Sequence, residues 1–156
     1  MTPRMKRGLE ISAREAELVK ALADFDRQRT RLFQETGVRQ SGEESAVSPE
    51  ERAVRAELRQ LTAERAAVLK EIADEQARLQ AKQSAFDRVR AKEKAAGRRK
   101  APASRAEEKV RARLAALQRE RAYVDGTVHR DRELGRLQEA IWWSSHDPET
   151  FDSGDW

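Results

Sequence analysis

The densest group of residues that could do chemistry is a run of cations between Arg88 and Arg105. A single acid, Glu93, lies among eight basic side chains there: Arg88, Arg90, Lys92, Lys94, Arg98, Arg99, Lys100 and Arg105. Such a concentration of positive charge attracts polyanions, which include nucleic-acid phosphates and acidic protein surfaces such as the tails of tubulin. A solvated helix end explains the run equally well. Phe86 has the spacing of a core residue, so the stacking of bases on an aromatic side chain is not supported.

A second group of candidate binding residues lies near the C-terminus. Residues 144–156 form an acidic tail, and all three tryptophans of the chain lie in or just before it. We interpret the aromatic side chains here as contacts for a partner protein, because tryptophan is enriched at binding hot spots: Trp142, Trp143, Phe151 and Trp156. For the first two, a place at the base of a helical bundle is the alternative, with Trp142 opposite Val54.

Catalytic and cofactor chemistry find little support in the sequence. His129 and His146 are the only histidines, and there is no cysteine to act as a nucleophile or a thiolate ligand. The glycines do not form a phosphate-binding G-x-x-x-x-G-K pattern, and no H-E-x-x-H metal motif occurs. We therefore expect a protein that is not an enzyme and that holds neither a metal nor a cofactor.

A spacing that occurs three times predicts the helices that position these groups. Each copy has Ser-x-x-Glu, the pattern of a helix capping box, followed by apolar residues at heptad spacing and one arginine. The copies are Ser12, Glu15, Leu18, Leu22, Phe25, Arg29 and Leu32; Ser48, Glu51, Val54, Leu58, Leu61, Arg65 and Val68; and Ser104, Glu107, Val110, Leu114, Leu117, Arg121 and Val124. The repeat therefore predicts three helix starts, three apolar seams and three seam arginines, of which Arg29 has no evident acidic partner.

The composition and the breaks in the chain set the expected boundaries. Of 156 residues, 38% are charged and only 5% aromatic, which suits long helices with a thin apolar seam. We predict helices at about 13–35, 49–96 and 105–143 in a rod of residues 12–143, after a basic lead of residues 1–11. The second helix would be about 70 Å long. Within the third, Asp131 and Gly135 continue the seam beyond Gly126, whereas Leu134, Leu137 and Ile141 lie off it.

We expect an all-α fold in which these helices form an elongated antiparallel coiled coil. Folding the second and third helices together about Arg98 places Ile72 opposite Val124 and Leu79 opposite Leu117. The same register predicts ion pairs between Glu75 and Arg121 and between Arg65 and Asp131, which would fix the register because a slipped pair buries a charge alone. The first helix would lie on the second with Phe25 opposite Leu58 and Ile11 opposite Ile72. The result is a three-helix base with a long two-helix arm, residues 73–123.

A long parallel dimer is the alternative architecture. The second and third copies are offset by a multiple of seven residues and share Val-Arg-Ala-x-Leu at 54–58 and 110–114. In such a dimer, however, Arg65 and Arg121 would each face their own copies. We therefore favour the hairpin, whose self-association stays open.

These features predict a non-enzymatic structural or adaptor protein of a larger assembly, such as a cytoskeletal or flagellar one. It would bridge two protein partners, one bound at its basic tip and one at its tail. The tip suits a partner with an acidic surface. One alternative is a nucleic-acid-associated protein that binds phosphates, and another is a hairpin stalk or chaperone of a secretion or export apparatus. No apolar stretch reaches the roughly 20 residues that span a bilayer. We therefore expect a cytoplasmic, or cytoskeletal, location.

Overall fold

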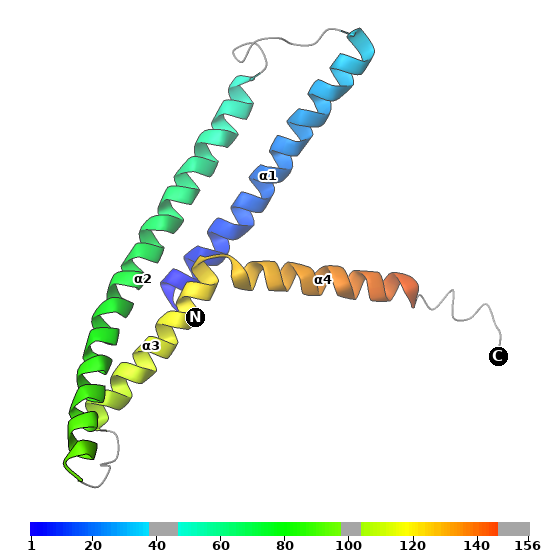
Figure 1. Cartoon of the computed structure of the whole chain (residues 1–156). Helices are drawn as coiled ribbons and strands as arrows, with labels where there is room; N and C mark the ends of the chain where they lie inside the picture. The colour runs from blue at the N-terminus through cyan, green and yellow to red at the C-terminus, as the bar shows by residue number, and fades with distance from the viewer. Residues whose placement is uncertain (38–46, 98–103, 147–156) are drawn as a thin grey trace, which may run out of the picture.

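The computed structural model describes residues 1–37, 47–97 and 104–146, which form four α-helices and no strand. They are α1 (Pro3–Thr36), α2 (Pro49–Ala95), α3 (Arg105–Val124) and α4 (Thr127–Ser145). Helices α1, α2 and α3 lie along a common rod, and α4 projects from it (Figure 1). The predicted all-α fold is confirmed. The third predicted helix, however, is two helices that run in different directions.

Two of the three predicted helix caps are present. The hydroxyl of Ser48 accepts a hydrogen bond from the backbone N–H of Glu51, and Ser104 caps α3 through Glu107 in the same way. Ser48 also precedes a proline at the first helical position, where the missing N–H costs nothing. These local signals were sufficient to place the starts of α2 and α3.

The predicted start of the first helix, at Ser12, is wrong. The helix begins at Pro3, and its cap is Thr2, whose hydroxyl accepts from the N–H of Met5. Thr2-Pro3 is as good a start signal as Ser12, and the added turns are stabilised by packing on other helices. The supposed basic lead of residues 1–11 is therefore part of the folded rod.

The N-terminal half of α1 completes a three-helix section in the middle of the rod. One buried cluster joins Ile11 and Leu18 of α1 to Leu61 of α2. A second joins Ile72 of α2 to Leu117 and Val124 of α3, with Val68, Leu69 and Leu79 packed around it. Beyond this section, α1 and α2 continue together at one end and α2 and α3 at the other (Figure 1). The beginning of α1 thus takes the place that was expected for the end of the third helix.

Gly8 shows how closely α1 approaches α3. A Cβ atom at this position would lie 2.6 Å from the carbonyl oxygen of Tyr123 and 2.8 Å from Cα of Val124. Both contacts are to backbone, which has no soft way to move aside. Only glycine permits this approach, so the crossing of α1 over α3 is encoded at Gly8.

Helix α3 ends at Val124, and an elbow around Gly126 separates it from α4. This residue has φ of +91°, a left-handed conformation that favours glycine. The carboxylate of Asp125 accepts a hydrogen bond of 2.9 Å from the N–H of Thr127, the first residue of α4. The predicted continuous helix over 105–143 is therefore wrong, and its second half does not form part of the base.

The expected contacts between charges also differ from those observed. Glu75 accepts hydrogen bonds from Arg113 and Arg4 rather than from Arg121. Arg65 binds Glu15 rather than Asp131, which is exposed on α4. The apolar contacts tolerate a small shift along the helices, whereas an ion pair depends on the reach and direction of two side chains.

The register of α1 on α2 differs as well. Arg7 binds Glu64 and Arg14 binds Glu57, each through an N–O distance of 2.6 Å. This register places Ile11 in the cluster of Leu61 rather than opposite Ile72. The two ion pairs are seven residues apart on each helix, so they lie on the same side of the helices and both fit the same register.

Candidate functional site

The two hairpin ends of the rod are closed by the same arrangement of charges. Glu51, at the third position of α2, is only 1% exposed. Arg29 of α1 donates to both of its oxygens, at 2.6 and 3.0 Å, and Arg55 of α2 donates at 3.0 Å. The hydrogen bond from Arg29, opposed by desolvation, lowers the pKa of Glu51. Arg29, which the sequence left without an acidic partner, thus has one.

Glu107 occupies the same position at the start of α3. It is 3% exposed, and it accepts from Arg90 of α2 at 2.5 Å and from Arg111 of α3 at 3.0 Å. In both hairpins, a buried glutamate lies three residues after the capping serine. It binds one arginine of the preceding helix and one arginine four residues after itself in the same helix. These paired charges hold neighbouring helices together.

The first copy of the repeat does not cap a helix, because it lies inside α1. Its serine and glutamate instead bind an arginine of α2. Arg65 of α2 donates to Glu15 at 2.8 Å, to the hydroxyl of Ser12 at 3.1 Å and to the carbonyl oxygen of Val124 at 3.0 Å. One guanidinium therefore joins α1, α2 and the last turn of α3, immediately before the elbow. The other carboxylate oxygen of Glu15, Oε1, is buried and has no hydrogen-bond partner among the described residues.

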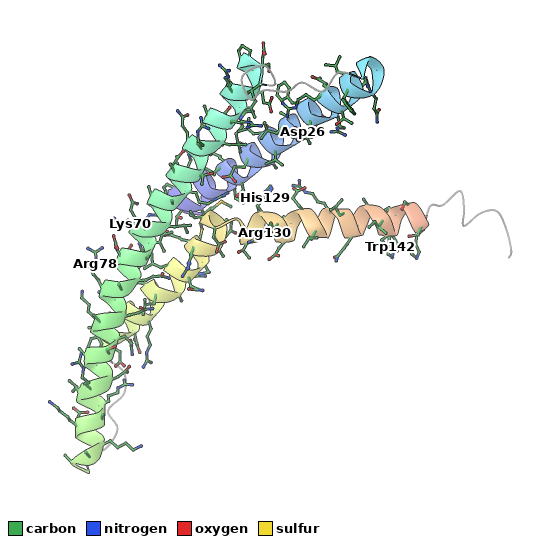
Figure 2. The ribbon with its side chains drawn as sticks, turned by 45° about the horizontal axis from the view of Figure 1, so that its top comes forward. Asp26, Lys70, Arg78, His129, Arg130 and Trp142 are labelled. Atoms are coloured by element: carbon green, nitrogen blue, oxygen red, sulfur yellow. The ribbon has the colours of Figure 1, made fainter. Side chains whose placement is uncertain are left out.

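An open crevice of about 610 Å³ lies beside this arginine, between α1 and the elbow. Its walls include Ser12, Glu15 and Val19 of α1 together with His129 and Arg130 of α4. Figure 2 shows His129 and Arg130 at the beginning of α4, where this helix leaves the rod. Among the described residues, no three histidine or acidic side chains converge to ligate a metal.

The basic tip that the sequence predicted lies at the free end of the α2–α3 hairpin. Arg88, Lys92 and Lys94 are exposed near the end of α2, and Arg105 is exposed at the start of α3. Arg90 is half-buried because it binds Glu107. Arg98, Arg99 and Lys100 lie outside the described residues. The described part of the tip therefore presents four exposed cations around one structural arginine.

The predicted aromatic group falls partly on α4, which has no buried residue. Trp142 and Trp143 are 50% and 56% exposed, and their rings meet edge to face at 4.9 Å. The ring of His146 stacks on Trp142 at 4.3 Å. The interpretation that Trp142 covers the base of the bundle opposite Val54 is wrong, because the elbow carries it away from the rod. Phe151 and Trp156 lie outside the described residues.

Sequence reasoning did not recognise that α4 exposes an aliphatic face. Leu134, Leu137 and Ile141 are 56%, 59% and 66% exposed, and their spacing of three and four residues puts them on one side of the helix. Their departure from the seam of α3 was the available signal. Leu134, Leu137 and Ile141, called the α4 stripe below, carry the apolar character of this helix without covering any core.

No helix among the described residues combines the length and apolar character that a membrane span requires. Comparisons with protein-family models, with curated proteins and with solved structures find no match for this chain.

Proposed function

We propose that this protein is a non-enzymatic helical adaptor that bridges two partners within a larger assembly. The observation that carries the proposal is the contrast between a rod with buried clusters and a projecting helix whose large apolar side chains are exposed. Exposed apolar patches of this kind are typical of protein–protein interfaces. A cytoskeletal or flagellar assembly in the cytoplasm would suit a basic rod of this length.

The first partner site is the aromatic end of α4. Trp142 and Trp143 offer large, rigid side chains, and aromatic anchors of this kind contribute most to binding energy when a partner buries them. His146 holds the ring of Trp142 by stacking and accounts for part of its surface. A partner with an apolar pocket would bury the remaining faces of both indoles.

The second partner site is the basic tip. Arg88, Lys92, Lys94 and Arg105 are exposed at one end of the rod, and opposite charge on a partner would accelerate association there. The tip and the end of α4 lie at separate extremities of the molecule (Figure 1). Two partners could therefore bind at the same time without touching, as an adaptor requires.

Nucleic acid is the alternative ligand of the basic tip, since phosphates satisfy the same cations. Phe86 is half-buried on α2, so the described tip offers no exposed ring on which a base could stack. The alternative therefore predicts binding without sequence preference that weakens steeply as salt is added. Salt-independent or absent binding to duplex DNA and to RNA would remove it.

The bridging proposal is tested with a tagged full-length chain and two variants. Replacing Arg98, Arg99 and Lys100 by glutamine weakens the tip, and W142A/W143A removes the aromatic anchors. We expect each variant to lose a different bound protein, and we expect the wild-type chain to hold both in one complex during two successive purifications. Lys70→Gln, at an exposed position in the middle of α2, is the control for altered charge away from both sites. Identical protein content in all four samples would contradict the proposal.

A further inference from the structure

The groove that receives α3 continues beyond the end of that helix. Arg65 anchors the last turn of α3 by donating to the carbonyl oxygen of Val124 at 3.0 Å. From that point α1 and α2 run on side by side without a third helix (Figure 1). The crevice beside Arg65 is the beginning of this vacant length, and the exposed Val19 lies in its wall.

One buried polar atom in this groove lacks a partner. Glu15 uses Oε2 to bind Arg65, while its Oε1 is buried without a hydrogen bond among the described residues. Buried acceptors are almost always satisfied in folded proteins, because leaving one without a donor is costly. The groove therefore has a place for an added hydrogen-bond donor as well as for apolar side chains.

Helix α4 has the dimensions and the surface of the missing third helix. It extends over 127–145, and the vacant part of α1 extends from Glu15 to Phe33, so both are about 27 Å long. The α4 stripe falls within an arc of about 60° around the helix, the width of a helix-packing seam. Arg130 of the same chain already lines the crevice but does not donate to Oε1 of Glu15, so that oxygen is open to a donor from the beginning of a second α4.

The elbow prevents α4 from filling the groove of its own chain. Gly126 in its left-handed conformation and the hydrogen bond from Thr127 to Asp125 direct α4 away from the rod. If α3 and α4 were one straight helix, the α4 stripe would lie about 100° or more from the buried face of α3. Straightening the elbow would thus leave the stripe outside the groove.

We propose that the groove is occupied by α4 of a second copy of this chain, and that the two copies exchange these helices reciprocally. Each copy has one vacant groove and one projecting helix, so the exchange closes as a two-fold dimer. The exchanged helix runs antiparallel to α2, as α1 and α3 do, which places its beginning in the crevice at Glu15, beside His129 and Arg130 of the receiving chain. Two helices about 27 Å long and 10 Å wide bury four footprints, about 1,100 Å² in total, which is the size of a weak but specific interface.

The exchange leaves the partner site of the adaptor accessible. Trp142 and Trp143 lie about 105° and 150° around α4 from the centre of the α4 stripe, so both indoles are outside the face that enters the groove. The dimer and the bridging function therefore use different faces of one helix. Failure of either leaves the other standing, because one is measured on purified protein and the other on captured partners.

The first test is the mass of the purified full-length chain in solution, measured by light scattering over a range of micromolar concentrations. We expect a mass that approaches twice the 17.8 kDa of one chain. Leu137→Asp should return it to that of a single chain, whereas Arg136→Gln, which changes the net charge equally on the opposite face, should not. A single-chain mass for the wild type at every concentration would overturn the proposal.

The second test identifies the occupant, using the absence of native cysteine. A chain carrying V19C and L134C is treated with a short bifunctional maleimide, and we expect crosslinks between chains that join position 19 to position 134. Glu17→Cys, exposed on the opposite side of α1 at nearly the same height, replaces V19C in the control and should not react with position 134. Crosslinks from 19 to 134 within one chain, crosslinks only from 134 to 134, or no crosslinks would each contradict the exchange.

Discussion

Helices α3 and α4 follow each other in the chain and have nearly the same length, 20 and 19 residues, yet only one is buried. Helix α3 buries Val110, Leu117 and Val124 at a spacing of seven, in phase with the seam of α2. Helix α4 buries no side chain, and its apolar residues have a different phase. The comparison shows that an apolar stripe finds a partner within the chain only where its phase and direction match a neighbouring helix.

The largest expected difference between the two helices concerns their leucines. Leu117 is fully buried, so Leu117→Ala should lower the free energy of unfolding by about 2–5 kcal/mol. Leu137 is mostly exposed, and Leu137→Ala should change it by only about 0.5 kcal/mol in dilute protein. Urea unfolding followed by circular dichroism measures both.

Protein concentration sharpens this first comparison. Because association stabilises the folded state, any effect of Leu137→Ala should grow as the concentration rises, while that of Leu117→Ala should stay constant. Equal losses for the two variants at all concentrations would show that α4 is packed into its own rod.

Replacing Gly8 or Gly135 by alanine should change the stability of the protein in opposite directions. Gly8→Ala places a Cβ atom against the backbone of α3 and should destabilise the protein by about 1–3 kcal/mol. Gly135 lies inside α4 with no atom within 4 Å of the added Cβ, so Gly135→Ala should stabilise that helix by about 0.5–1 kcal/mol. Thermal melts of both variants test the pair, and a destabilising Gly135→Ala would indicate that α4 is covered by the rod.

The acid sensitivity of the rod is the smallest of the expected differences. Because hydrogen bonds from Arg29 keep the pKa of Glu51 below its ordinary 4.5, the folded state binds its proton at lower pH than the unfolded state. The stabilisation is therefore complete above about pH 4.5 and is lost as the pH falls through the lower folded value. The same argument applies to Glu57, Glu64 and Glu75, whose pKa values arginine hydrogen bonds also lower.

The measurement is the urea midpoint as a function of pH. Glu51→Gln should flatten its decline below pH 4.5, because glutamine has no proton to bind. Glu139→Gln on α4 is the control, since Glu139 is exposed and belongs to no ion pair among the described residues. A decline that is equally steep in all three proteins would show that Glu51 does not contribute to acid unfolding.

The amino-acid sequence alone was sufficient to predict features that depend on residues close to one another along the chain. The caps at Ser48 and Ser104 could be predicted because each serine precedes a segment of helix-forming residues and is followed by a glutamate three residues later. The cluster of Ile72, Leu117 and Val124 follows from heptad spacing, because only one face of each helix is apolar. The basic tip and the tryptophans were visible as composition, and their roles stay proposals.

Features that depend on distant segments were missed. The chain offers start signals at both Thr2 and Ser12, and the packing of residues 3–11 on α2 and α3 decides between them. Gly126 reads as a weak point within a helix, whereas in the structure it adopts a left-handed turn beside a hydrogen bond from Thr127 to Asp125. The repeated spacing of Arg7 and Arg14 against Glu57 and Glu64 did contain the correct register of α1.

Both proposals require that α4 stays away from the groove of its own chain. The most direct test is the distance between spin labels at Thr30→Cys on α1 and Ser144→Cys on α4, measured in labelled chains diluted with unlabelled protein so that only pairs within one chain contribute. We predict a long distance, because the elbow at Gly126 directs α4 away from α1. A dominant short distance, close to the 8–10 Å that separates packed helices, would place α4 in its own groove and contradict the account.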